Sequence, residues 1–382
     1  MSDAAGGTSQ GRARLDSAWL IARAHDWGYP EVGVRTLQTF RSQGLLPRPT
    51  TVDHDGQKPI NVYPEIAERQ LASVLYWQKF NRNHDVLRVA LWLDGYPVDL
   101  DLVRESIESR LVDLQLSADR VMAKLAPVAE LADKLGALET LARRVVRQRR
   151  YPIPMNSEAR LADRVTAVKS LANMFLLGGE PLEDTEEHGQ LIERAIGLTP
   201  SARTRRIPGY GPWLTGPATD LFAMARMLSL PALVEVSRTA TEDELIQART
   251  AAVAIFRYLP VMARAAAAVF GGSNPVGIRA VGLFDQQPQF APWLVTIMIA
   301  ANRNGLQDNL DQIVAPLTEV PARIAEARQL RRLSPQQIAE NIARQPKRDR
   351  ARIKRVVKAV QDGSLLPAGP MSPALLPKQS SQ

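Results

Sequence analysis

Residues 35–42 place hydrogen-bonding side chains on one side of a predicted helix. The spacing i, i+3, i+4, i+7 gives these residues a common face: Arg35, Gln38, Thr39 and Ser42. A guanidinium and a side-chain amide can hydrogen-bond base edges in the major groove, and hydroxyl groups and cations suit phosphate oxygens. The pattern therefore predicts a face suited to nucleic acid, and the alternative is a polar face that only contacts solvent.

Apolar residues predict how this helix is held and where it ends. Val34, Leu37 and Phe40 would form the opposite side, which faces a core. Gly44 stands where a left-handed C-terminal cap is needed, and Pro47 prevents the helix from continuing. The segment therefore predicts a short helix with a sharply specified end.

A helix and a small sheet are predicted on either side of this segment. Residues 15–27 predict a first helix, capped by Asp16 or Ser17. Its residues available for packing are Leu20, Ile21, Ala24 and Trp27. Residues 53–60 are polar and rich in turn formers, which indicates a two-stranded wing. The order is that of a helix-turn-helix followed by a wing.

These features resemble the DNA-binding domain of MerR-type transcriptional regulators. The pattern T-L-x-x-F-x-x-x-G-L-L-P at residues 36–47 is similar to the recognition helix and following turn of that family. As in the family, the wing leads to a tyrosine, Tyr63, just before a third helix, and a fourth helix at residues 85–93 ends at Gly-Tyr-Pro. The resemblance covers the first quarter of the chain and implies a winged helix-turn-helix that binds double-stranded DNA as a homodimer.

The resemblance also implies which residues contact DNA. Arg35 and Gln38 are expected at base edges. The residues expected at phosphates are Thr39, Arg41, Ser42 and Lys58. Thr36 and Tyr63 are included because they belong to the matching pattern. The family usually has Arg where Gln38 stands and Tyr where Thr39 stands, so its clamp on the DNA backbone is expected at Arg35 or Arg41. The connection at residues 25–32 is also longer than usual.

Helical periodicity dominates the remainder of the chain, which predicts a mainly α protein. Residues 98–150 predict a helical connector with a break at Pro127, and its apolar positions either join two protomers or pack within one chain. Its first apolar seam consists of Ile107, Leu111, Leu114, Ala118, Val121 and Leu125. After a linker at 151–154, residues 151–333 predict a larger α-helical domain for effector sensing or oligomerisation.

The remaining segments complete the predicted domain organisation. Residues 15–97 form the DNA-binding domain, and a basic helix begins at the N-cap Ser334 and covers 334–362. Gly- and Ser-rich residues 1–14 and Pro- and Ser-rich residues 363–382 predict disordered tails.

The positive charge of the chain is concentrated near its C-terminus. Net charge is +8 with a pI near 9.9, which permits binding to polyanions. Residues 321–358 carry twelve Lys and Arg against three Asp and Glu. This basic segment suits nucleic-acid phosphates, and the alternative is a solvated helical face.

Several classes of site are disfavoured by the composition. The chain has no cysteine, which excludes disulfides, thiolate metal sites and cysteine nucleophiles and fits a cytoplasmic location. Its histidines lack the spacing of metal ligands: His25, His54, His84 and His188. We expect no catalytic residues, no cofactor, no bound metal and no membrane span.

The sequence favours a sequence-specific transcriptional regulator that is not an enzyme, with two alternatives left open. One is a helical enzyme or small-molecule binder with an N-terminal interaction module. Its pocket, or that of an unknown effector, would draw on aromatic residues that otherwise form core: Tyr210, Trp213, Phe222, Phe256, Phe270 and Trp293. The other is an architectural protein that binds nucleic acid without sequence preference.

Overall fold

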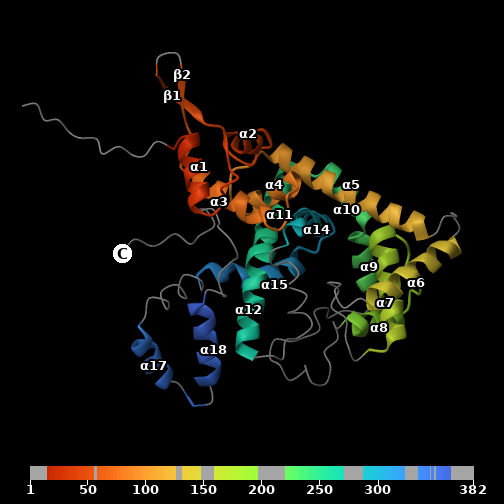
Figure 1. Ribbon diagram of the computed structural model, residues 1–382. Coiled ribbons are helices and arrows are strands. Elements are labelled where there is room, and N and C mark those ends of the chain that lie inside the picture. Colours follow the sequence, from red (N-terminus) through yellow and green to blue (C-terminus); the bar gives the residue numbers. More distant parts are fainter. Residues whose placement is uncertain are drawn as a thin grey trace, which may run out of the picture.

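The computed structural model describes residues 15–55, 58–125, 131–147, 159–196, 220–270, 287–322, 334–344, 346–347 and 350–362. Within these residues the chain is mainly helical, as the sequence predicts, and its strands form one two-stranded sheet. None of the described helices is long and apolar enough to cross a membrane. Figure 1 shows the hairpin standing at the top beside α1 and α2, and the long helix α5 running away from them.

The N-terminal elements follow the predicted order. They are α1 (Ser17–Asp26), α2 (Val34–Ser42), β1 (Thr50–Asp55), β2 (Lys58–Val62), α3 (Ile66–Gln78) and α4 (His84–Leu93). Asp16 caps α1, because its carboxylate accepts a hydrogen bond from the Trp19 amide at 2.8 Å. The strands β1 and β2 are antiparallel, with Thr50 opposite Val62 and an irregularity between Thr51 and Asp53.

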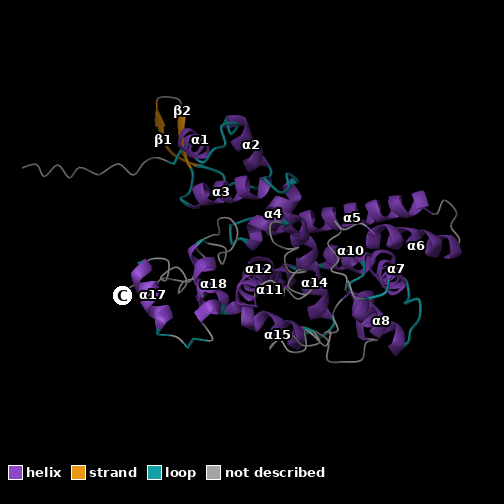
Figure 2. Cartoon of the chain, turned by 60° about the horizontal axis from the view of Figure 1, so that its bottom comes forward, coloured by secondary structure: helices purple, strands orange, loops and turns teal. Residues whose placement is uncertain are grey.

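A long helix connects this group to the middle of the chain. The elements are α5 (Leu100–Leu125), α6 (Leu131–Arg147), α7 (Leu161–Leu177), α8 (Glu186–Ile196) and α9 (Asp220–Met227). The first half of α5 packs on α4, and α5 also contacts α10 (Leu230–Thr239). Helices α6, α7 and α8 pack in succession at the far end of α5 (Figure 2).

The remaining helices cover the other side of α4 and α5. They are α11 (Glu242–Val253), the π-helical turn η2 (Ala254–Tyr258), α12 (Leu259–Phe270), the 3-10 turn η3 (Pro288–Phe290), α14 (Ala291–Arg303) and α15 (Gln307–Thr318). One apolar cluster runs from Leu20 in α1 to Val320 just after α15. The first helices therefore share a core with the later ones, and the division into separate domains stays a prediction about independent folding.

A buried ion pair lies where α3, α4 and η2 meet. The Asp94 carboxylate is 3.2 Å from the Arg257 guanidinium, with side chains 0% and 2% exposed. It also accepts hydrogen bonds from the Trp77 indole at 2.7 Å and the Ser73 hydroxyl at 2.8 Å. Burial raises the pKa of the Asp94 carboxyl, while Arg257 and the two donors oppose that rise. This network ties the C-terminal end of α4 to the later helices.

The basic segment near the C-terminus forms two helices, so the prediction of one continuous helix over 334–362 is wrong. They are α17 (Pro335–Ala343) and α18 (Arg350–Gln361). Ser334 caps α17 as predicted, accepting a hydrogen bond from the Gln337 amide. Pro346 lies between the helices, and its ring and missing amide hydrogen disfavour a helix through that point.

The predicted apolar seam of α5 is buried only in part. In the seam of α5, Ile107 and Leu111 are buried as expected, whereas Leu114 and Val121 are exposed. The predicted break at Pro127, the linker at 151–154 and both tails lie outside the described residues, and Tyr210 and Trp213 do as well.

Candidate nucleic-acid interface

The N-terminal end of α2 is held by its own residues. Gly33 is the N-cap, and its amide donates to the Thr36 hydroxyl at 3.3 Å. Thr36 is half-buried by this arrangement. Of the predicted site residues, Thr36 therefore stabilises the start of α2, and its neighbours on the outer face are better placed for a partner.

The outer face of α2 carries the predicted base-reading residues. Arg35 and Gln38 are both exposed, one helical turn apart. Among the described residues, neither side chain has a hydrogen-bond or ion-pair partner. The structure brings these two groups together on a surface where both point away from the core. Their hydrogen-bonding capacity is available for an external partner.

The two hydroxyl groups on this face are oriented toward their own helix. Thr39 donates to the Arg35 carbonyl oxygen at 3.0 Å, and Ser42 donates to the Thr39 carbonyl oxygen at 2.9 Å. Both side chains are exposed. A hydroxyl must rotate away from its carbonyl before it can donate to a phosphate oxygen, so these two residues are weaker phosphate ligands than a free cation.

Val34 is on the outer face, which corrects the prediction that it packs with Leu37 and Phe40. Its side chain is 56% exposed, while Leu37 and Phe40 are buried. The reason is its position as the first residue of α2, beyond the end of the core beneath the helix. An apolar group therefore stands beside Arg35 and Gln38, and only its exposure in the fold reveals this.

Arg41 and Tyr63 form a pair at the flank of α2. The Arg41 guanidinium lies 6.0 Å from the centre of the Tyr63 ring, a distance that allows a cation–π contact. Tyr63 is 2% exposed, and its amide donates to the Leu15 carbonyl oxygen at 2.7 Å. Tyr63 is thus a core residue that supports Arg41, rather than a surface residue in direct reach of DNA as predicted.

The hairpin of β1 and β2 projects beside α2 (Figure 1). Lys58 begins β2 at the tip, opposite Asp55 in the register, and the placement of its side chain is outside the described structure. Val52 is exposed on β1. The Thr51 hydroxyl donates to the Asn61 side chain at 2.9 Å and links the two strands.

The C-terminal end of α2 turns sharply at Gly44. Its φ of +67° lies in the left-handed region that favours glycine. A Cβ atom at this position would lie 2.8 Å from the Leu102 side chain of α5, closer than such atoms approach. Leu45 and Leu46 follow and are buried. The turn therefore needs glycine for its backbone conformation, and a side chain at this position would also displace the end of the Leu102 side chain.

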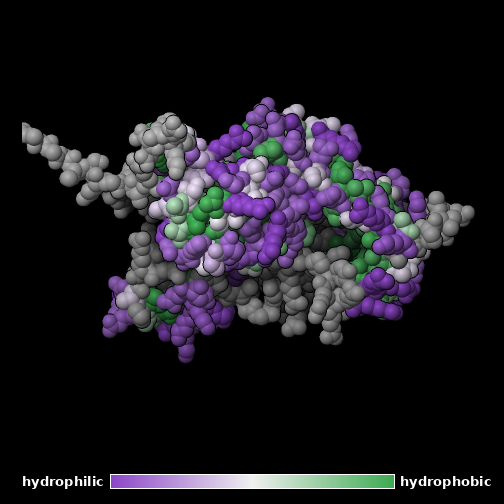
Figure 3. Space-filling model, turned by 45° about the horizontal axis from the view of Figure 1, so that its top comes forward, coloured by the Kyte–Doolittle hydropathy of each residue, from purple (hydrophilic) through white to green (hydrophobic). Residues whose placement is uncertain are grey.

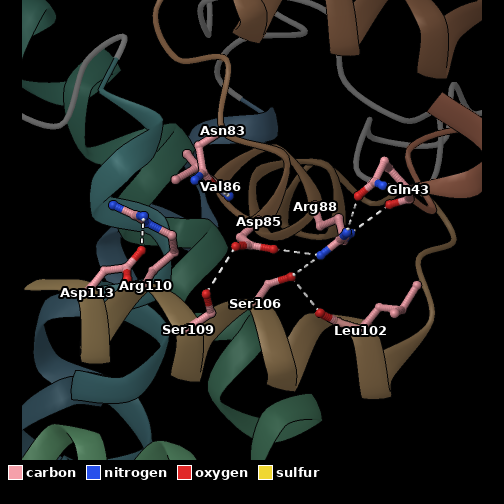
Figure 4. A network of polar contacts seen from close by, with 10 residues as sticks. All are labelled: Gln43, Asn83, Asp85, Val86, Arg88, Leu102, Ser106, Ser109, Arg110 and Asp113. Carbon is pink, nitrogen blue, oxygen red and sulfur yellow. Dashed lines mark hydrogen bonds and ion pairs between the residues drawn. The ribbon is translucent and has the colours of Figure 1, made fainter. Parts of the chain in front are cut away.

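Arg88 joins α2 to α4 and α5, as Figure 4 shows. Its guanidinium donates to the backbone oxygen of Gln43 at 2.6 Å and to the Gln43 side chain at 2.9 Å. It also pairs with Asp85 at 2.7 Å and donates to the Ser106 hydroxyl at 2.9 Å. The C-terminal end of α2 is thus fixed to the N-terminal part of α5, so a rotation of α5 would carry α2 with it.

A cavity lies apart from this surface, between α6, α7 and α8. Its volume is about 660 Å³, and Lys169, His188 and Glu139 are among its lining residues. Lys169 pairs with Glu139 at 3.3 Å, and the buried His188 ring is 2.9 Å from the Ser170 hydroxyl. Within the described residues there is no cluster of three or more His, Asp or Glu that could hold a metal ion.

Comparisons with known proteins give no match to this chain. No protein-family model matches its sequence, no curated protein matches it, and no solved structure matches its fold. The function is therefore inferred from the geometry of the site.

Proposed function

We propose that the chain is a sequence-specific, DNA-binding transcriptional regulator in which residues 15–97 act as a MerR-like winged helix-turn-helix. The observation that carries the proposal is the outer face of α2, where Arg35 and Gln38 are exposed and have no partner in the described structure. The opposite face of α2 is buried and both of its ends are fixed. A rigid helix with an unpaired polar face suits the major groove, which admits one α-helix.

The proposed contacts divide into base reading and backbone positioning. Arg35 hydrogen-bonds a guanine edge and Gln38 an adenine edge, which are the pairings that their donor and acceptor geometry favours. Val34 contacts the methyl group of a thymine next to them. Arg41, backed by the Tyr63 ring, binds a phosphate, and Lys58 reaches the backbone from the wing. Thr39 and Ser42 contribute weaker phosphate contacts.

A second copy of the chain is the proposed partner of α5. The far half of α5 exposes Leu114 and Val121, seven residues apart on one face, with the half-buried Ala118 between them. Apolar residues at this spacing form the seam of a paired helix. Because Arg88 fixes α2 to α5, pairing through α5 would set the distance between two recognition helices. Two half-sites one helical turn apart, about 34–36 Å, are the expected target.

The cavity between α6, α7 and α8 is the proposed place for an effector. Its volume of about 660 Å³ falls in the range of small-molecule sites. Lys169 and Glu139 offer both signs of charge at its wall. Since α6 follows α5 in the chain, a ligand that changes the packing of α6 on α7 can act on the helix that carries the proposed dimer seam.

Selection of duplexes from a random library by the purified protein tests the proposal. We expect enrichment of a two-fold symmetric site. Arg35→Ala with Gln38→Ala should weaken binding to that site by about 2–6 kcal/mol, since each bidentate base contact provides about 1–3 kcal/mol of discrimination. Binding to random duplexes should change far less. Arg144→Ala, which removes an exposed arginine of α6, is the matched control and should leave both affinities unchanged.

Two results would refute the base-reading proposal. The first is a library without enrichment in dilute buffer. The second is an equal loss of affinity for selected and random duplexes in the Arg35→Ala, Gln38→Ala variant, which would limit these side chains to phosphate contacts.

A further inference from the structure

Helix α18 has an apolar face and a cationic flank. The helix contacts α12, and its buried or half-buried apolar residues follow the spacing i, i+3, i+4, i+7: Ile353, Val356, Val357 and Val360. Arg350, Lys354 and Lys358 follow the spacing i, i+4, i+8 along the edge of this apolar face, and all three are exposed. The helix is thus covered on its apolar face and presents a row of positive charge along the flank.

Positive charge predominates around this row. Residues 344–358 carry eight Lys and Arg and one Asp. In the described structure neither Lys354 nor Lys358 forms an ion pair. The Arg350 guanidinium donates to the Ala343 carbonyl oxygen at 2.8 Å, which holds the end of α17 against α18. Figure 3 shows mainly hydrophilic residues at the lower left, where α17 and α18 lie.

The spacing of the row fits the phosphates of a nucleic-acid strand. Residues four apart in a helix are separated by about 6 Å along its axis. Each nucleotide of a DNA strand carries one phosphate, so a row of cations with this spacing can meet several phosphates of one strand. Such contacts depend on charge and distance and do not read sequence.

The row lies far from the proposed base-reading face. Helices α17 and α18 are separated from α2 and the hairpin in both Figure 1 and Figure 2, with α3 and the later helices between them. A straight duplex seated on α2 therefore cannot also run along α18. A DNA partner of α18 would therefore be a separate segment.

We propose that α18 binds the phosphate backbone of a second DNA segment, so that one protomer bridges two duplexes. The proposal relies on the proposed function only for the first duplex, on α2. Lys354 and Lys358 supply the main contacts, with Arg350 beside them. The second segment is bound without sequence preference, because the row offers cations and no fixed acceptor group.

Capture of one duplex by another tests this bridge in the full-length protein. A selected-site duplex is immobilised and loaded with protein, and capture of a labelled random duplex is measured. We expect Lys354→Glu with Lys358→Glu to reduce capture at least tenfold while affinity for the selected site stays within about twofold. Lys354→Arg with Lys358→Arg should retain capture. The salt slope for random duplex should become shallower by about 1.8, since each lost phosphate contact removes about 0.9.

A charge-matched control separates this surface from net charge. Lys124→Glu with Lys134→Glu changes two exposed lysines of α5 and α6 and should leave capture unaltered. Unaltered capture in the α18 variant, an equal loss in the control, or a stronger capture of duplex RNA than of DNA would each overturn the proposal. If the library selects no site, the proposed function fails, but capture of a labelled random duplex by an immobilised random duplex still tests α18. The failure of either proposal can therefore be told from that of the other.

Discussion

The polar residues of α2 and those at the junction of α3, α4 and η2 differ in whether their charges and hydrogen-bonding groups have partners within the described structure. At the junction, Asp94 and Arg257 are almost fully buried and pair with each other. Trp77 and Ser73 donate hydrogen bonds to the Asp94 carboxylate. On α2, Arg35 and Gln38 are exposed, without partners in the described structure.

The difference separates groups that hold the fold from groups that are open to a ligand. A buried charge must be compensated inside the protein, because leaving it unpaired is costly. An exposed, unpaired group costs little and contributes little to folding. Removal of the junction residues should therefore damage stability, whereas removal of the α2 residues should damage only binding.

The largest expected effect is at the junction. Arg257→Met should lower the free energy of unfolding by about 3–5 kcal/mol, since it leaves the buried Asp94 carboxylate without its cation. Arg35→Ala should change it by less than about 0.5 kcal/mol. Denaturant unfolding of both variants measures the contrast. The double variant Asp94→Asn, Arg257→Met should recover part of the loss, and an unaltered stability of Arg257→Met would contradict the assignment.

Gly44→Ala should have the next largest effect. The left-handed backbone at +67° costs about 1–3 kcal/mol for a residue with a Cβ atom, and the contact with Leu102 adds to that cost. Thermal unfolding measures it. Adding Leu102→Ala should relieve the contact but not the backbone strain. If Gly44→Ala were as stable as the wild type, the left-handed backbone at this position would not be as described.

A smaller effect is expected where Val34 meets DNA. Replacing the contacted thymine of a selected site by deoxyuridine removes one methyl group and should weaken binding by about 0.8 kcal/mol, or about fourfold. Titration of both duplexes with wild type and Val34→Ala measures this. The replacement should have no effect in Val34→Ala, and an equal loss in both proteins would exclude Val34 as the contact.

The smallest effect concerns a partly exposed ion pair that contrasts with the buried one. Hydrogen bonds from Arg303, with those from Thr241, lower the pKa of Glu244 to about 2. Because the folded pKa is below the ordinary value of 4.5, the stabilisation is present above about pH 4.5 and lost as the pH falls toward 2. Solvent screening limits it to about 1 kcal/mol. Glu244→Gln should flatten this part of the stability profile, and an unchanged profile would contradict the assignment.

Local signals explain which parts of the fold were predictable from sequence. Asp16, Gly44 and Ser334 mark helix ends through the conformation or hydrogen bonds of nearby residues, and all three do so in the structure. Periodicity likewise placed Leu37 and Phe40 in the core. These features depend on neighbours within a few positions, which a single sequence displays.

Features that depend on distant residues were not predictable. Arg88 contacts Gln43 from 45 positions away, and Asp94 meets Arg257 across a still longer stretch of chain. No pattern in the local sequence predicts such pairs. Val34 fits the apolar period of α2 but lies beyond the edge of the core, so its exposure depends on what packs beneath the helix.

Methylation interference at guanine N7, which lies in the major groove, measures whether α2 reads bases. Duplexes of a selected site, methylated at one guanine each, are separated into bound and free fractions. We expect at least one guanine at which methylation blocks the wild-type protein but not Arg35→Ala. Interference that is identical in both proteins, or absent from every guanine of the site, would contradict the reading of bases by α2.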